Sequence, residues 1–218
     1  MSHIHLPDGV IPTFWWVIGY ILASAVLAFA FYQTKSTNIQ RKVPLLGMMA
    51  ALMLVSQSIP LGPIPFHLNL AVLSGIILGP WLGLIAVFIS NLFLAFVGHG
   101  GITVVGLNTL VVGSEAILGS FLFAILRKQM LSVMIAAMLT TFITLIVSIS
   151  LMVGIVALSQ VNPAFILGER AGGGPAIKLS IPRFVMIIAP FATIGTIIES
   201  LITGLVVRFI TVVRSDIL

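Results

Sequence analysis

The chain has 218 residues, a length typical of one domain or at most two. Hydrophobic residues make up 60% of it and charged residues 7%, whereas soluble domains average roughly 45–50% apolar and about 25% charged. Five acidic and ten basic side chains cannot cover a water-facing surface, so we predict an integral membrane protein. The net charge is +5, but the basic residues lie mainly in the loops between apolar segments and do not form a nucleic-acid-binding surface. The absence of cysteine excludes disulfides and thiolate metal sites.

Seven apolar segments are predicted to form helices in the membrane, where a spanning helix needs about 20 apolar residues. Their predicted ranges are 14–32, 44–59, 68–78, 81–97, 104–126, 131–158 and 184–210. The third is short, because the prolines of 60–65 break the chain before it and Gly79-Pro80 ends it. The predicted fold is therefore an all-α, multi-pass protein of the plasma membrane, with residues 1–218 as a single transmembrane domain.

Basic residues predict the orientation of these helices, because Lys and Arg concentrate in cytoplasmic loops. With seven spans and the N-terminus outside, seven of the ten basic residues fall inside the cell. The three that fall outside are Arg170, Lys178 and Arg183. The consistent topology has the N-terminus outside and the C-terminus in the cytoplasm.

All four histidines fall on the predicted outer side: His3, His5, His67 and His99. Histidine is the most common metal-ligating side chain, and nitrogen ligands suit nickel, copper, zinc and cobalt. Residues 1–13 are therefore predicted to form a metal-binding segment that folds over the outer face. The alternative is that the terminal histidines belong to a cloning tag or bind nothing.

The N-terminus is a candidate chelator, because a free amine, backbone amides and a nearby imidazole can close rings around one ion. If Met1 is retained, Met1-Ser2-His3 supplies four nitrogens; if Met1 is removed, Ser2-His3 supplies three. His67 is then the candidate for the fourth position. Square-planar nitrogen coordination favours nickel or copper, with cobalt also possible.

Other polar residues have weaker assignments. Asp8, in a Pro-Asp-Gly turn, is predicted to cap the first helix or turn in preference to holding a ligand imidazole. Asn69 is expected to bond either a ligand histidine or a neighbouring helix. His99 is expected to support a ligand or to lie on the path of the incoming ion. His67 itself has the alternative of a hydrogen bond at the membrane interface.

Two carboxylates, Glu115 and Glu199, fall inside predicted spans, where an ionisable group is a functional candidate. We favour bonds between helices, to Asn91, Asn108 or a hydroxyl, over a proton relay. Nothing in the sequence is similar to a nucleotide-binding loop. The chain is therefore predicted to be no enzyme, and active transport would need an ion gradient or another subunit.

Four motifs resemble those of the CbiM/NikM proteins, the substrate-binding (S) components of energy-coupling-factor transporters for cobalt and nickel. They are HLPDGV at 5–10, LGPWLG at 78–83, GHGGIT at 98–103 and GLNT at 106–109. The resemblance implies transport of Ni²⁺ or Co²⁺ as the ligand, without a permanently bound cofactor. It also implies partnership with a transmembrane T component and two ATPase subunits, in support of cobalamin synthesis or nickel enzymes.

The resemblance further implies a metal site made by the free N-terminus, a histidine just after it, and a histidine before the third helix. His67 matches the last of these. For the N-terminal amine and the histidine just after it, we favour a processed terminus, Ser2-His3. His5 is an additional or competing ligand, because it is the histidine that aligns with the family's when the Pro-Asp-Gly motifs are matched. Gly47 and Ala51 are assigned as contacts for the T component.

Two other functions fit the same composition. One is a self-contained ion-coupled metal transporter with Glu115 and Glu199 as coupling groups, and the other is a membrane metal sensor. Under the transport-subunit hypothesis, replacing either glutamate by Gln should leave metal binding intact.

Overall fold

The structure is a computed structural model that describes residues 6–35, 39–59, 67–129, 131–166 and 179–214. Within these ranges every regular element is a helix, which confirms the predicted all-α fold. The elements are α1 (Thr13–Thr34), α2 (Ile39–Ser58), α3 (Ala71–Leu78), α4 (Pro80–Phe96), α5 (Val105–Lys128), α6 (Val133–Leu158), a 3₁₀ turn (Pro163–Phe165) and α7 (Ile181–Val213).

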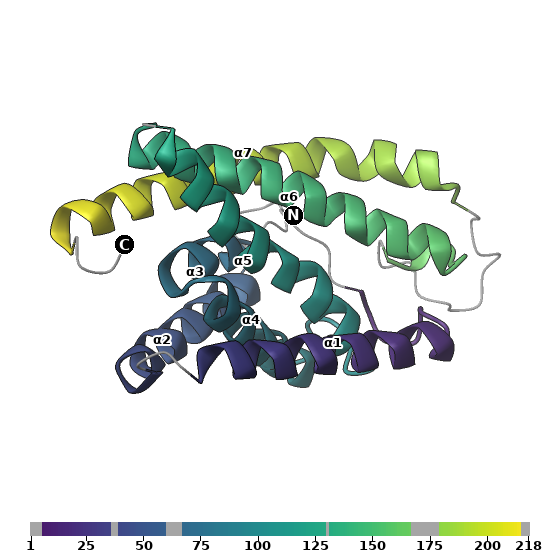
Figure 1. Ribbon diagram of the computed structural model, residues 1–218. Helices are drawn as coiled ribbons and strands as arrows, with labels where there is room; N and C mark the ends of the chain where they lie inside the picture. Colours follow the sequence, from purple (N-terminus) through teal and green to yellow (C-terminus); the bar gives the residue numbers. More distant parts are fainter. Residues whose placement is uncertain (1–5, 36–38, 60–66, 130, 167–178, 215–218) are drawn as a thin grey trace.

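Helix α5 occupies the centre of the bundle. It contacts α1, α3, α4 and α6, while α6 packs along α7 and α2 packs on α4. Figure 1 shows α6 and α7 on one side of the molecule and α1 on the other, with α3 and α5 between them. The central position of α5 brings the N-terminal and C-terminal halves of the chain into contact.

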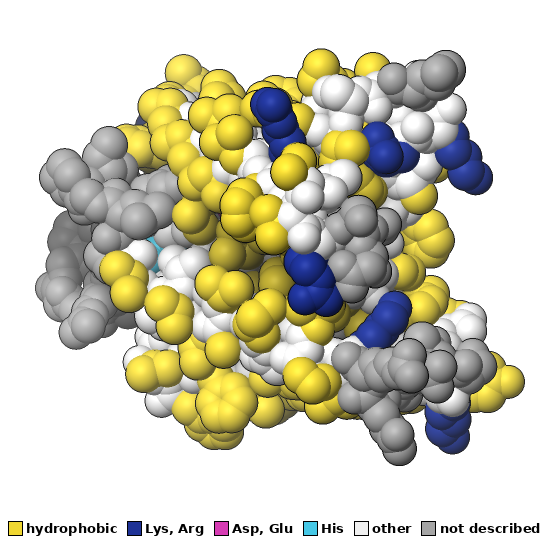
Figure 2. Space-filling model, turned by 90° about the vertical axis from the view of Figure 1, so that its left-hand side faces the viewer, with side chains coloured by type: hydrophobic (Ala, Val, Ile, Leu, Met, Phe, Trp, Pro, Cys, Tyr) yellow, Lys and Arg dark blue, Asp and Glu magenta, His cyan; other side chains and the backbone are white. Residues whose placement is uncertain are grey.

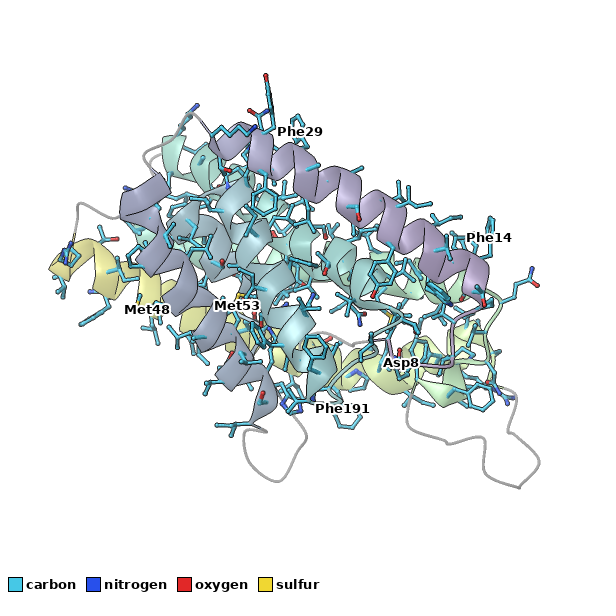
Figure 3. The ribbon with its side chains drawn as sticks, turned by 90° about the horizontal axis from the view of Figure 1, so that it is seen from below. Asp8, Phe14, Phe29, Met48, Met53 and Phe191 are labelled. Carbon is cyan, nitrogen blue, oxygen red and sulfur yellow. The ribbon has the colours of Figure 1, made fainter. Side chains whose placement is uncertain are left out.

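Four helices are long and apolar enough to cross a membrane: α1, α5, α6 and α7. Helices α2 and α4 are shorter apolar helices. Large apolar side chains on the outside of the bundle include Phe14, Phe29 and Phe191, which are 68%, 46% and 52% exposed (Figure 3). Met53 instead points inward and is fully buried. Such an apolar exterior is suited to lipid, and the chain is a multi-pass membrane protein.

Helix α3 is too short to cross the bilayer, because its eight residues span about 12 Å against a hydrocarbon core of about 30 Å. Seven of its eight residues are buried. Close packing explains this burial: Gly75 of α3 lies directly against the backbone of Ala116 in α5. A Cβ on Gly83 of α4 would lie 2.9 Å from the Gly75 Cα. Helix α3 is therefore an internal half-helix wedged between α4 and α5.

Helix α2 begins earlier than the sequence predicts, at Ile39 instead of residue 44. Pro44 lies inside this helix, at its sixth residue. A proline so close to the start removes only one backbone hydrogen bond, and the helix continues through it. The other predicted helices agree with the structure to within a few residues at each end.

Basic side chains gather at one end of the bundle. Lys35 and Lys42 flank the α1–α2 connection, Arg127 and Lys128 end α5, and Arg214 follows α7. Figure 2 shows Lys and Arg together on one half of this face, with a histidine side chain on the other half. The orientation that places this basic end in the cytoplasm stays a prediction.

The contact at Gly75 generates a stability prediction. A Cβ at Gly75 would overlap the Ala116 carbonyl, so Gly75→Ala should destabilise the protein by about 1–3 kcal/mol. We expect a fall of several degrees in the thermal unfolding midpoint in detergent. Gly47→Ala is the matched control, because nothing lies within 4 Å of a Cβ at Gly47. An equal midpoint for the two variants would contradict the close packing of α3 on α5.

Candidate metal centre

The N-terminal segment is fixed to the start of α5 by two hydrogen bonds between the Leu6 backbone and the Asn108 side chain. The Leu6 N–H donates to the Asn108 Oδ1 (3.0 Å), and the Asn108 Nδ2 donates to the Leu6 carbonyl (3.2 Å). The Leu6 side chain is fully buried and packs in a cluster with Val104 and Phe184. The chain that carries the candidate chelating terminus is therefore anchored at its sixth residue.

Asp8 supplies a second anchor, on the loop before α5. Its carboxylate accepts hydrogen bonds from the Ile102 N–H (2.9 Å), the Thr103 N–H (2.8 Å) and the Thr103 hydroxyl (2.6 Å). Gly101 gives the chain room here, because a Cβ at that position would collide with Asp8. Partial burial raises the pKa of the Asp8 carboxyl, but the three hydrogen bonds outweigh it and leave the pKa below its ordinary value of 3.8.

The prediction that Asp8 caps the first helix is wrong. Helix α1 has Pro12 as its N-cap residue, without a side-chain cap. Asp8 instead binds the two successive N–H groups of Ile102 and Thr103, 94 and 95 residues further along the chain. Local sequence cannot separate these two roles, because Pro-Asp-Gly forms a turn in either case.

His67 and His99 lie side by side, although 32 residues separate them. Their ring centroids are 5.0 Å apart, and the rings meet edge to face at 73°. Partial burial lowers the pKa of both imidazoles. At His67, a hydrogen bond with the backbone of Ile59 raises the pKa and partly offsets the lowering by burial. At His99, the neighbouring His67 lowers the pKa further. Lowered pKa values favour the neutral imidazole, the form that binds metals.

The loop over 98–103 connects these features. It carries His99 at its start and, at its end, the two N–H groups that bind Asp8. Figure 3 shows Asp8 beneath the N-terminal end of α1, which Phe14 marks. A single short loop therefore connects the anchored N-terminal segment with the two histidines.

A buried hydrogen-bond network begins two residues after His67, at Asn69. The Asn69 Nδ2 donates to Glu115 of α5, which also accepts from the Ser148 hydroxyl of α6. The Gln57 Nε2 of α2 donates to both the Oδ1 and the backbone carbonyl of Asn69, at 3.2 Å each. These four side chains are at most 1% exposed. The network therefore joins α2, α5 and α6 to the segment that precedes α3.

Glu199 of α7 binds the backbone of the same segment. Its two oxygens accept from the Asn69 N–H (3.2 Å) and the Leu70 N–H (3.0 Å). Leu70 adopts the left-handed region, with φ 61° and ψ 12°, which directs both N–H groups to one side. Helix α3 thus receives a carboxylate at its N-terminus, where unpaired N–H groups and the helix dipole favour negative charge.

The predicted ligands fall into two groups. Met1, Ser2, His3 and His5 lie outside the described residues, whereas His67, Asn69 and His99 lie together near the anchored N-terminal segment. Asn69 bonds neighbouring helices, one of its two predicted roles. Within the described ranges, no three His, Asp or Glu side chains group closely enough to hold a metal ion.

Both glutamates form hydrogen bonds to other segments of the bundle, which is the structural role that we favoured. Of the partners that we expected, only the hydroxyl is found. Glu115 accepts from a hydroxyl, as predicted, and from Asn69. Asn108, an expected partner, binds Leu6 instead. Sequence reasoning also missed Gln57, whose position in an apolar segment was the available signal, because a buried amide requires partners.

Comparison with known proteins identifies the family. Residues 5–217 match the CbiM family, described as the cobalt uptake substrate-specific transmembrane region. The chain belongs to the CbiM family. This membership confirms the resemblance found in the sequence.

Individual relatives agree with this family. A cobalt transport protein CbiM of Sorangium cellulosum is 27% identical over 145 residues, which cover 62% of this chain and 64% of that protein. A second relative is named as a fused nickel transport protein, NikMN, of Archaeoglobus fulgidus. It is 26% identical, and the match covers 99% of this chain and 68% of that protein. The chain thus matches under two thirds of the Sorangium protein.

The fold is also shared with a solved structure. A crystal structure of a transition metal transporter superposes with a TM-score of 0.79, covering 97% of this chain and 94% of the other at 19% sequence identity. The arrangement of helices is therefore retained at an identity too low to carry functional detail.

The Asp8 anchor can be tested by hydrogen exchange. Asp8→Asn removes the charge and one of the two acceptor oxygens, so the Ile102 and Thr103 amides should exchange several-fold faster. In the native chain the anchor should be fully present above pH 3.8 and weaken as the pH falls through the lower pKa of folded Asp8. Unchanged exchange in the variant would contradict the anchor.

Proposed function

We propose that this chain binds Ni²⁺ or Co²⁺ at its outer face and carries the ion across the membrane as the S component of an energy-coupling-factor transporter. The observation that carries this proposal is the meeting of His67, His99 and the anchored N-terminal segment at one loop. Membership of the CbiM family supports the choice of cargo. ATP hydrolysis would come from partner subunits.

Chain geometry supports a ligand set from the N-terminus. Because the Leu6 backbone is fixed, the three residue steps back to His3 can reach at most about 11 Å from it, at about 3.6 Å per residue. We therefore assign the ligands to the terminal amine, on Ser2 or Met1, with the His3 amide and imidazole, and to His67. His5 is an additional or competing ligand. A metal site at His67 needs ligands from the N-terminus, because the described residues supply no group of three ligating side chains there.

His99 is assigned a supporting role. Its ring contacts that of His67 edge to face, so it can fix the orientation of the ligand imidazole or receive an incoming ion first. Asn69 follows His67 by two residues, and it supports His67 because its own backbone is held in place by a hydrogen bond. A neutral His67 and a deprotonated amine would together bind the ion without displacing a proton from the imidazole.

Energy coupling is assigned to a transmembrane T component and two ATPase subunits. Gly47 and Ala51 of α2 are exposed, with open space around Gly47, and remain the proposed contacts for the T component. Both carboxylates already accept structural hydrogen bonds: Glu115 from the Asn69 and Ser148 side chains, and Glu199 from the backbone N–H groups just before α3. That engagement favours the S-component hypothesis over an ion-coupled transporter that uses these carboxylates.

Metal titration tests the site. Purified protein should bind one equivalent of Ni(II) tightly and give the yellow absorption of a low-spin, square-planar complex. Both N-terminal acetylation and His67→Ala should abolish this complex, because each removes a nitrogen ligand. Lys128→Ala, at the basic end of the bundle, is a control that should leave binding unchanged. Binding that survives both acetylation and His67→Ala would refute the proposed ligand set.

Uptake into vesicles tests the energy source. The chain alone should bind Ni²⁺ or Co²⁺ without accumulating it, and accumulation should appear when the T component and both ATPase subunits are added with ATP. Accumulation by the chain alone, driven by a pH gradient, would instead establish an ion-coupled transporter. Binding without uptake in the complete complex would favour a sensor.

A further inference from the structure

We infer that Glu199 is a positioning residue for the metal site: its carboxylate holds the backbone at Asn69 and Leu70 in the one conformation that presents His67 as a ligand. This inference rests on the proposed function, because it takes His67 as a metal ligand. It assigns a role in metal binding to a carboxylate in the membrane interior that would not itself touch the ion.

The segment from His67 to Leu70 is held from both sides. On one side, Gln57 of α2 donates to the Asn69 side chain and carbonyl, and His67 bonds the backbone of Ile59. On the other side, Glu199 of α7 accepts both backbone N–H groups of Asn69 and Leu70. The position of His67 is thus determined by contacts from two separate helices.

The backbone itself needs this support. Leu70 is in the left-handed region, which costs a non-glycine residue of order 1–3 kcal/mol unless its surroundings hold it there. The two N–H groups that this conformation aligns are buried in an apolar bundle, where only Glu199 accepts them in the described structure. Removing one acceptor oxygen leaves one buried N–H without a partner and lets the segment relax.

Such relaxation reaches the metal site directly. His67 precedes Asn69 by two residues, so a change in the backbone at 69–70 moves the base of its side chain. Metal sites require their ligands within about 0.5 Å of the ideal position, and residues that orient a ligand typically contribute 10–100-fold to affinity. A shift of the Asn69 backbone would therefore weaken the bond to His67 before it unfolded the protein.

Glu115 provides an unusually close control. It is as fully buried as Glu199 and also binds Asn69, but only through side chains. A Gln at 115 can accept from the Asn69 Nδ2 with its oxygen and donate to the Ser148 hydroxyl with its amide. A Gln at 199 has one oxygen for two N–H groups, and its amide must face one of them. The same substitution therefore has different consequences at two equally buried sites.

The experiment compares Glu199→Gln with Glu115→Gln by Ni(II) titration and visible absorption. Glu199→Gln should weaken Ni(II) binding by about 10- to 100-fold and reduce the low-spin absorption, while Glu115→Gln should bind within about threefold of the native chain. From the sequence alone, neither change should affect binding. Thermal unfolding of each variant without metal establishes that binding is measured on folded protein.

A second variant covers the case in which Glu199→Gln does not fold. Gln57→Met keeps the side-chain volume but removes both hydrogen bonds to Asn69, and it should also weaken Ni(II) binding. If Glu199→Gln and Gln57→Met, when folded, both bind Ni(II) as the native chain does, the inference is overturned. An equal loss in Glu115→Gln and Glu199→Gln would overturn it too, because loss of a buried charge would then explain both.

His67→Ala in the same series separates this inference from the proposed function. If His67→Ala binds Ni(II) like the native chain, the proposed site fails. If His67→Ala abolishes binding while Glu199→Gln retains native affinity and spectrum, the site stands and only the positioning role fails.

Discussion

Buried hydrogen bonds between two carboxylates and the short segment before α3 fix how the helices of the bundle meet. Leaving a charged or amide group without partners in an apolar interior costs several kcal/mol, so Glu115, Glu199 and Gln57 must all find partners there. They find them on Asn69 and Leu70, with Ser148 completing the set. Helices α2, α5, α6 and α7 are consequently tied to one point, close to His67.

The second requirement is to hold a chain terminus in place. A terminal amine is a useful ligand only if the residues behind it are fixed, because each free residue adds conformational entropy that binding must overcome. Leu6 and Asp8 meet this requirement through five hydrogen bonds to α5 and the loop before it. The same loop carries His99 against His67, so one short segment organises both sides of the proposed site.

Helix α3 explains why these parts can meet inside a membrane protein. As a buried half-helix it ends within the bundle, and non-helical backbone at its N-terminus is tolerated because protein groups satisfy it. The glycine contacts with α5 and α4 hold it there. A solved transition metal transporter shares this fold at 19% sequence identity, so the arrangement of the helices is compatible with a widely different sequence.

Hydrophobic runs, prolines and short motifs are local signals. They are enough to predict the membrane class, the order and approximate ends of the helices, the family resemblance, and His67 as a candidate ligand. Three contacts follow instead from the packing of the helices: His99 lies against His67, Asp8 binds the loop before α5, and Glu199 binds the backbone beside His67. These contacts join residues 32, 94 and 130 positions apart. Their geometry depends on how the helices pack, and neither hydropathy nor motif spacing contains that information.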